Sequence, residues 1–264
     1  MSAPRYQSAS TAAAVSLLFA LLFLQSSAAF ASEAGGFAEH PDLGIIVQKI
    51  TEAQLDNRDR AKPYSVTREY KVFGTDAAKP RTDVVAKVNF LPPNVKNYDI
   101  DQSTGGMGEK VIRHILDHEV DAARDPRMMM VNQQNYDFAF IGEDVLGGTP
   151  CYKLQITPRH ERKELLKATL WVDKNSYRIL RLEGDPVKSP SFWVKDVHLV
   201  LEFGEVAGMW LQTQTSALAH LRFGGEYKLT SQDLDYDVTR SVAANGHYNV
   251  SRKHSPAMMA ASVR

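Results

Sequence analysis

The chain has 264 residues, of which 44% are hydrophobic, and its 31 Lys and Arg residues balance 31 Asp and Glu residues. This balance excludes a broad electrostatic attraction to nucleic acid or to an anionic membrane, so we expect partners to be recognised by shape. The one cysteine, Cys151, excludes an internal disulfide. Stability must therefore come from a buried core, and we expect Cys151 to be a packed strand residue.

The N-terminal segment has the pattern of a secretory signal peptide. Arg5 precedes an apolar run from Ala12 to Leu24, and Ala29-Phe30-Ala31 then forms a small-x-small cleavage pattern. An uncleaved membrane anchor is the alternative, but the run is shorter than the roughly 20 residues that a spanning helix needs. We expect residues 1–31 to be removed and the mature chain, from Ser32, to be a soluble periplasmic or secreted protein. No cysteine follows the cleavage site, so no acyl anchor is expected.

Apolar residues at helical spacing predict two helices. The first begins after Asp42, a good N-cap, places Ile46, Val47 and Ile50 on one face, and ends before Pro63. The second runs from Gly108 to about Ala123 and ends at Asp125-Pro126. Its apolar stripe consists of Val111, Ile112, Ile115, Leu116 and Val120. The three methionines that follow, Met128 to Met130, suit core filling better than a surface for apolar ligands.

Alternation of apolar and polar residues predicts strands through the remainder of the chain. They are expected at Tyr64–Phe73, Val84–Leu91, Phe138–Glu143, Tyr152–Thr157, Leu166–Val172, Arg178–Leu182, Val194–Phe203, Trp210–Leu221 and Tyr227–Val238, with a short extended piece around Tyr98 and Ile100. Short, glycine-containing joins connect the later strands, which favours an antiparallel meander. We expect one mainly β domain over residues 32–240 and a mobile tail over 241–264.

Three stretches carry a resemblance to a known family. They are Gly147-Gly148-Thr149-Pro150-Cys151-Tyr152-Lys153-Leu154, then Leu170-Trp171-Val172-Asp173-Lys174 with Arg178 to Gly184, and Ser191-Phe192-Trp193-Val194-Lys195-Asp196-Val197. The sequence resembles the outer-membrane lipoprotein-sorting-like proteins over Pro41 to Val238, in its uncharacterised bacterial branches. The resemblance implies an unclosed antiparallel β-barrel, or half-barrel, with two lid helices over an apolar interior that receives acyl chains.

Residues that would line such a cavity follow from the resemblance and the apolar stripes. The candidates are Val111, Ile112, Ile115, Leu116, Leu170, Trp171, Trp193, Leu199, Leu201, Trp210 and Leu211. For the three tryptophans, ordinary packing in the core or on a sheet face is the default interpretation, and the lining role rests on the resemblance. The basic run from Arg159 to Lys167 is expected to be a solvated hairpin tip, with a headgroup-contacting rim as the alternative.

Motifs for catalysis are weak in this sequence. His114 and His118 stand one helical turn apart, but a metal site needs a third ligand and none is placed by the spacing, so a solvated helix flank is preferred. Cys151 begins a strand after Pro150 and lacks the electropositive setting of a catalytic thiol. The sequence has no Gly-x-Ser-x-Gly elbow and no phosphate-binding glycine loop. We expect neither an enzyme nor a cofactor.

Three functions remain in order of preference. The first is a soluble periplasmic protein that holds lipid or lipoprotein acyl chains in a half-barrel cavity, in outer-membrane lipoprotein or lipid transport. The second is a non-catalytic sensor or assembly module that binds a protein partner, such as an inner- or outer-membrane protein, with the same fold. A metal-dependent enzyme at His114 and His118 is third. No nucleic-acid partner is expected.

Overall fold

The computed structural model describes residues 42–162, 164–189, 192–222 and 224–238. The expected signal peptide and C-terminal tail lie outside these residues.

Ten strands form one antiparallel sheet. Their bounds are β1 Tyr64–Phe73, β2 Thr82–Leu91, β3 Val95–Ser103, β4 Tyr136–Leu146, β5 Thr149–Pro158, β6 Leu166–Asp173, β7 Ile179–Pro186, β8 Val194–Val206, β9 Met209–Leu221 and β10 Gly225–Asp237. The spatial order is β3-β2-β1-β10-β9-β8-β7-β6-β5-β4. Within the described chain, β3 and β4 each have one neighbouring strand, so the sheet is not closed. The prediction of a mainly β, unclosed half-barrel with two helices is confirmed.

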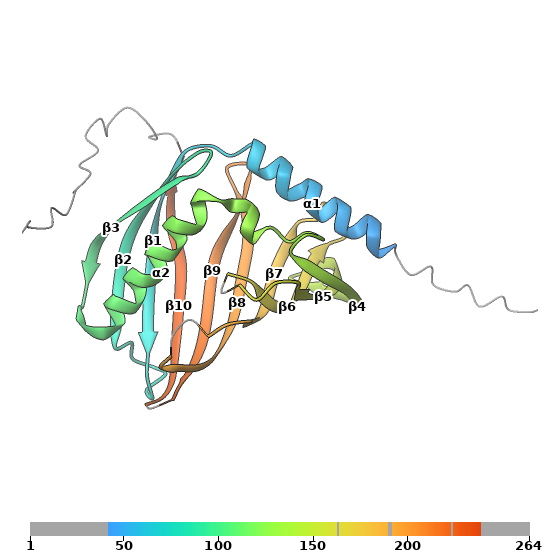
Figure 1. Cartoon of the computed structure of the whole chain (residues 1–264). Coiled ribbons are helices and arrows are strands. Elements are labelled where there is room, and N and C mark those ends of the chain that lie inside the picture. Colours follow the sequence, from blue (N-terminus) through green and yellow to red (C-terminus); the bar gives the residue numbers. More distant parts are fainter. Residues whose placement is uncertain (1–41, 163, 190–191, 223, 239–264) are drawn as a thin grey trace, which may run out of the picture. The chain divides into compact units, whose positions relative to one another are not determined.

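Two helices lie across the same face of this sheet, which we call the inner face (Figure 1). Helix α1 spans Leu43–Asp59 and α2 spans Gly106–Arg124, followed by a short 3₁₀ helix, η1, at Pro126–Met129. As predicted, Asp42 caps α1, because its carboxylate accepts the Gly44 N–H at 2.8 Å. Helix α2 begins two residues before the predicted start. Gly108 lets it approach β2 closely, since a Cβ there would lie 2.2 Å from Thr82 Oγ1.

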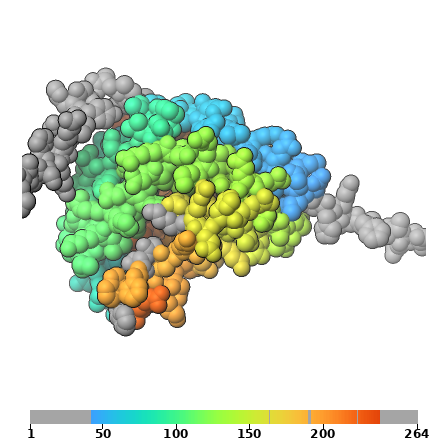
Figure 2. Space-filling model, viewed as in Figure 1, coloured from blue at the N-terminus to red at the C-terminus, as the bar shows by residue number. Residues whose placement is uncertain are grey.

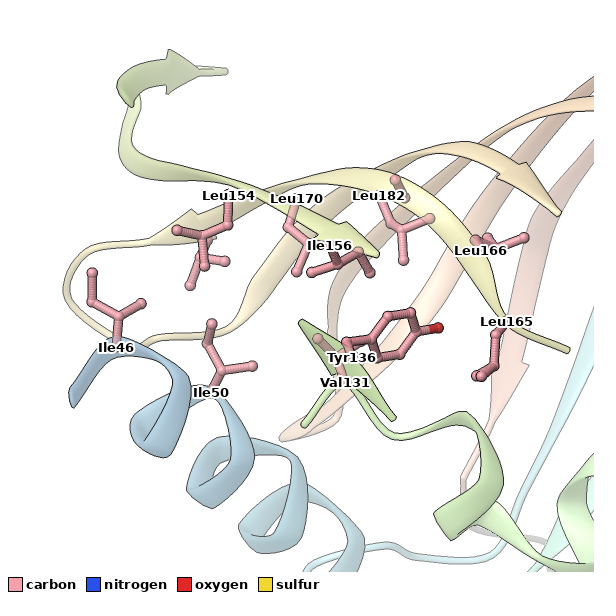
Figure 3. Close-up of a cluster of buried hydrophobic side chains, with 12 residues drawn as sticks. Ile46, Ile50, Val131, Tyr136, Leu154, Ile156, Leu165, Leu166, Leu170 and Leu182 are labelled. Carbon is pink, nitrogen blue, oxygen red and sulfur yellow. The ribbon is translucent and has the colours of Figure 1, made fainter. Parts of the chain in front are cut away.

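Each helix buries its own set of apolar side chains. Ile46 and Ile50 of α1 point toward Leu154, Leu170 and Leu182 of β5, β6 and β7 (Figure 3). Ile112 and Leu116 of α2 pack against the second set, which β1 and β2 supply. That set contains Val66, Tyr70, Val72, Val84, Ala86 and Val88. We call these the α1 cluster and the α2 cluster. Of the predicted α2 stripe, Ile112 and Leu116 face the sheet, whereas Val111 is exposed.

Several strands are longer than predicted. The extended piece at Tyr98 and Ile100 is a full strand, β3, paired with β2. Strand β8 continues to Val206 because the chain reverses in a two-residue turn, Ala207-Gly208, with φ angles of 51° and 84°. Such a turn matches the twist of the flanking strands and lets both pair up to the turn. Strand β2 ends at Leu91, directly before Pro92-Pro93, as predicted.

Candidate functional site

The strand register places one row of side chains across the inner face. Residues that lie directly opposite each other in neighbouring strands point to the same face of a sheet. The row runs Leu170, Leu182, Leu201, Thr215, Ser231, Tyr70 and Val84. Its first two members belong to the α1 cluster, and its last two belong to the α2 cluster. The register thus shows, independently of Figure 1, that both helices cover the same face.

Between the two clusters, the inner face of β8, β9 and β10 carries small and apolar side chains that are only half-buried. We call this surface the central strip and define it as Val197, Leu199, Leu201, Thr215, Ala217, Ala219 and Leu229. The residues on either side of it, under the helices, are almost fully buried. Figure 2 views the molecule from the helix-covered side, with α2 in green. The strip is therefore mainly apolar, lies on the helix-covered face and is partly accessible to solvent.

A charged cluster borders the strip on the side of α2. Arg68 of β1 pairs with Asp233 of β10 and lies 3.0 Å from the Glu119 carboxylate on α2. Lys96 Nζ of β3 lies 3.3 Å from the same carboxylate, and the Tyr236 hydroxyl donates to Asp233. The Arg68 side chain is 8% exposed and that of Asp233 is 2% exposed. Two cations and two anions are thus compensated almost entirely by each other at the inner face.

The pKa values of Glu119 and Arg68 both shift toward the charged forms. Burial favours neutral Glu119, but Lys96 and Arg68 outweigh burial, so the pKa of the Glu119 carboxyl is lowered. Burial by itself lowers the pKa of Arg68, but the Glu119 carboxylate and Asp233 raise it, so Arg68 stays charged. Sequence reasoning missed this cluster. The sequence did contain an indication of it. Arg68 stands two residues from both Val66 and Tyr70, on the face of the strand that is otherwise buried, so a charged partner was to be expected there.

Most candidate lining residues lie on the inner face. Ile112, Leu116 and Leu170 are fully buried in the two clusters, and Leu199 and Leu201 lie in the central strip. Ile115 is half-buried and Val111 is 50% exposed on α2. Trp210 lies against the end of α1, where its backbone N–H donates to Asn57 Oδ1 at 2.6 Å.

Three candidates lie elsewhere. Trp171 follows inward-facing Leu170, so it points to the outer face, where its ring lies 4.9 Å from Lys153 Nζ. Leu211 is opposite Gly204, because a register shift between Glu202 and Phe203 changes which β9 residues face inward. Trp193 is 62% exposed and directly precedes β8. Alternation within β6 is enough to place Trp171 on the outer face, but it could not reveal the placement of Leu211, since a bulge reverses the alternation.

The histidine pair on α2 is not arranged as a metal site. His114 is exposed, and His118 Nε2 lies 3.9 Å from Glu164. In the described ranges, no group of three His, Cys, Asp or Glu side chains could hold a metal ion. Cys151 is buried, its thiol lies 3.2 Å from the Thr149 carbonyl, and burial raises its pKa, so the nucleophilic thiolate is disfavoured. Its predicted role as a packed strand residue is confirmed.

Two further hollows flank α1 outside the strip. One is lined by Lys49, Glu52, Ala53, Asp56, Arg60, Ser176, Tyr177 and Arg178. The other is lined by Leu43, Gly44, Val47, Gln133, Tyr136, Asp137, Phe138 and Arg159. Both contain charged side chains at their walls, which suits water better than an acyl chain.

The fold and the strip together define a half-barrel with an apolar inner surface between two helices. No family model matches the chain, and no curated protein matches it. Among the described helices, none is long and apolar enough to cross a membrane.

Solved structures with a similar fold include a DUF1329 family protein from Desulfovibrio piger, at 15% identity and a TM-score of 0.39, covering 75% of this chain and 95% of that one. An outer membrane lipoprotein-sorting protein domain from Vibrio parahaemolyticus matches at 14% identity and a TM-score of 0.43, covering 75% and 96%. A LolA superfamily protein from Nitrosomonas europaea matches at 13% identity and a TM-score of 0.38, covering 75% and 94%. The lipoprotein-sorting family that the sequence resembles is thus among these structures. Likenesses this distant concern the fold and assign no ligand.

Proposed function

We propose that the protein is an extracytoplasmic binding protein that holds acyl chains of a lipid or lipoprotein along the central strip, between α1 and α2. The observation that carries this proposal is the strip itself. Its apolar residues lie on the helix-covered face and keep partial access to solvent, while both neighbouring clusters are buried. An apolar surface in this position supports a role in binding apolar ligands.

The apolar side chains of the strip are sufficient to bind an acyl chain without polar contacts. Burial contributes about 0.8 kcal/mol per methylene, so roughly eight buried methylenes would contribute ~6 kcal/mol. The small side chains of Ala217 and Ala219 leave room for a chain to lie along β9. Binding rather than catalysis is the proposed activity, and no cofactor is part of it.

The location belongs to the same proposal. Residues 1–31 have the charge, apolar run and cleavage pattern of a signal peptide. Its removal would release the half-barrel as a soluble periplasmic or secreted protein, where lipids and acylated proteins pass between membranes.

A protein partner is the second candidate function, and the edge of β4 favours it, since among the described residues β4 has a neighbouring strand on one side alone. This strand has 11 residues, and Ile141 and Val145 on it are 47% and 64% exposed. An edge strand with exposed apolar residues can accept an extended segment of another chain by backbone hydrogen bonding.

A bulky substitution in the central strip tests the proposal that the strip binds acyl chains. Ala217→Trp should abolish saturable binding of a fluorescent fatty-acid probe, because the new ring would occupy the space along β9. Leu218→Trp is the matched control, since the neighbouring residue points to the outer face opposite His198 and Lys228. Binding by the control and not by the plugged variant supports the proposal. If the unmodified protein shows no saturable binding and carries no lipid in native mass spectrometry, the partner-binding function replaces it.

A further inference from the structure

A buried hydroxyl group with unused hydrogen-bonding capacity lies beside the central strip. Ser231 of β10 stands directly opposite Thr215 of β9 and Tyr70 of β1, so all three side chains point to the inner face. Ser231 is only 5% exposed. Within the described ranges, its hydroxyl forms no hydrogen bond with the protein. Buried polar groups are normally paired, so this hydroxyl is free to bond a ligand that reaches it.

The opposing hydroxyl of Thr215 also has a hydrogen to donate. A register shift between β8 and β9 puts Gln212 opposite Phe203, and the Gln212 amide donates to Thr215 Oγ1 at 2.6 Å. Thr215 Oγ1 therefore accepts a hydrogen bond, while its own hydrogen has no acceptor among the described residues. Directly opposed side chains in an antiparallel pair have Cβ atoms about 5 Å apart, so the two hydroxyl groups are neighbours. We call Gln212, Thr215 and Ser231 the polar spot.

The inner face differs on the two sides of the polar spot. In one direction along β9 and β10, the next inward-facing residues are Ala217, Ala219 and Leu229. In the other direction, the next inward-facing residue on β10 is Asp233, which pairs with Arg68 in the charged cluster. An acyl chain lies more favourably on apolar side chains than against buried ions. A chain that begins at the polar spot should therefore run toward Ala219.

The charges beside the polar spot compensate each other. Arg68 pairs with Asp233 and Glu119, and Lys96 shares the Glu119 carboxylate. A ligand carboxylate at the spot would thus be a poorly compensated anion in a buried setting, which is costly. A neutral carbonyl oxygen needs only hydrogen-bond donors, and two hydroxyl groups supply them.

We propose that the polar spot recognises the carbonyl oxygen of an ester- or amide-linked acyl chain, which then lies along Ala217 and Ala219. The Ser231 hydroxyl donates to this oxygen, and the Thr215 hydroxyl, which is held by Gln212, is the second donor. A carbonyl oxygen has two lone pairs and accepts both bonds. The inference rests on the proposed function, because it names the linkage and the direction of the chain that the central strip holds.

Lipids that differ only in the carbonyl test this contact. A palmitoyl monoglyceride carries an ester, whereas the matching hexadecyl glycerol ether has the same chain and headgroup without the carbonyl oxygen. The unmodified protein should bind the ester at least about threefold more tightly, the effect of one net hydrogen bond. Displacement of a fluorescent fatty-acid probe measures both affinities.

Ser231→Ala removes the buried hydroxyl with little change in shape. It should weaken binding of the ester about threefold to tenfold and leave binding of the ether unchanged, so that the preference is lost. Thr215→Val should act in the same direction. Ser216→Ala is the matched control, because this neighbouring hydroxyl faces outward between Val200 and Thr230. The control should keep the preference for the ester.

Stability distinguishes recognition of a ligand from a structural role of the hydroxyl. Because the Ser231 hydroxyl has no partner in the described chain, Ser231→Ala should leave the free energy of unfolding of the ligand-free protein unchanged or raise it. Urea unfolding measures this change. A clear loss of stability would show that the hydroxyl bonds within the protein and would overturn the proposal.

A substitution further along β9 tests the direction of the chain. Ala219 is four residues from Thr215, which is a distance of about 14 Å along the strand. Ala219→Trp should weaken binding of the palmitoyl monoglyceride about tenfold or more. Binding of the octanoyl monoglyceride should be unchanged, because its chain ends before that position. An equal loss for both chain lengths contradicts the proposed direction.

An amide-linked chain identifies the source of the ligand. N-palmitoylethanolamine presents the amide of an N-acylated protein, and the monoglyceride presents the ester of a glycerolipid; the one that Ser231→Ala weakens more is the chemistry that the spot recognises. If ester, amide and ether bind equally and Ser231→Ala changes none of them, the carbonyl contact is wrong although acyl-chain binding stands. If none of the three binds saturably, the proposed function fails, and this inference fails with it.

Discussion

The guanidinium of Arg68 lies 3.0 Å from the Glu119 carboxylate, and this ion pair joins strand β1 to helix α2 at the border of the central strip. Helix α1 is attached differently. Asn57 exchanges two hydrogen bonds with the Trp210 backbone, at 2.9 and 2.6 Å, and Gln54 exchanges two with the Val131 backbone, at 2.9 and 3.0 Å. The attachment of α2 thus includes ion pairs that depend on pH and salt, whereas these contacts of α1 are between neutral groups.

Glu119→Gln should lower the free energy of unfolding by about 1–3 kcal/mol, because Arg68 and Lys96 lose a shared anion while Arg68 keeps Asp233. Chemical denaturation measures the change. Glu52→Gln, at an exposed position on α1, is the control and should change stability by less than ~0.5 kcal/mol. An equal effect of the two substitutions would show that the buried ion pairs contribute nothing.

The same ion pairs predict a dependence on acid. The pKa of Glu119 is lowered in the folded protein from its ordinary value of 4.5. Its stabilising contribution is therefore fully present above that value and is lost as the pH falls through the folded pKa. The stability difference between the unmodified protein and Glu119→Gln should accordingly shrink as the pH falls below 4.5. Thermal unfolding across this range measures it, and a difference that grows in acid contradicts the prediction.

Asn57→Ala should destabilise the protein by about 1–3 kcal/mol, because the backbone N–H and C=O of Trp210 lose their side-chain partners in a partly buried setting. Gln48→Ala, at an exposed position on the same helix, should be nearly neutral. Urea unfolding of both variants measures the two changes in the free energy of unfolding. A neutral Asn57→Ala would mean that water replaces the side chain at no cost.

Gly108→Ala should cost about 1–3 kcal/mol, since the added Cβ would lie 2.2 Å from Thr82 Oγ1 and would push α2 away from β2. The double variant with Thr82→Gly tests the cause. In a double-mutant cycle, removing the Thr82 side chain should cancel part of the cost of Gly108→Ala. Strictly additive effects would exclude this contact as the origin.

His114→Ala with His118→Ala should leave the melting temperature and fatty-acid binding almost unchanged, because one side chain is exposed and the other lies 3.9 Å from Glu164. Elemental analysis of the unmodified protein completes the test. Stoichiometric zinc that disappears in the double variant would contradict it.

Local patterns in the sequence sufficed for the elements of the fold. Alternation around Leu170 predicts a strand because side chains along a strand point to opposite faces, and the spacing of Ile112 and Leu116 predicts a helix face because both lie on one side of a 3.6-residue turn. Asp42 predicts the start of α1 because a carboxylate at that position satisfies free N–H groups. These relations involve neighbours within a few residues, so the sequence alone determines them.

Tertiary structure decided which of these elements meet and which face is inward. Arg68 and Asp233 pair across 165 residues because β1 and β10 are neighbours, and no local pattern specifies that pairing. Bulges and register shifts, such as the one that places Leu211 opposite Gly204, reverse the faces that uninterrupted alternation predicts. The central strip likewise exists only because two separate helices cover the ends of one row of side chains and leave its middle open.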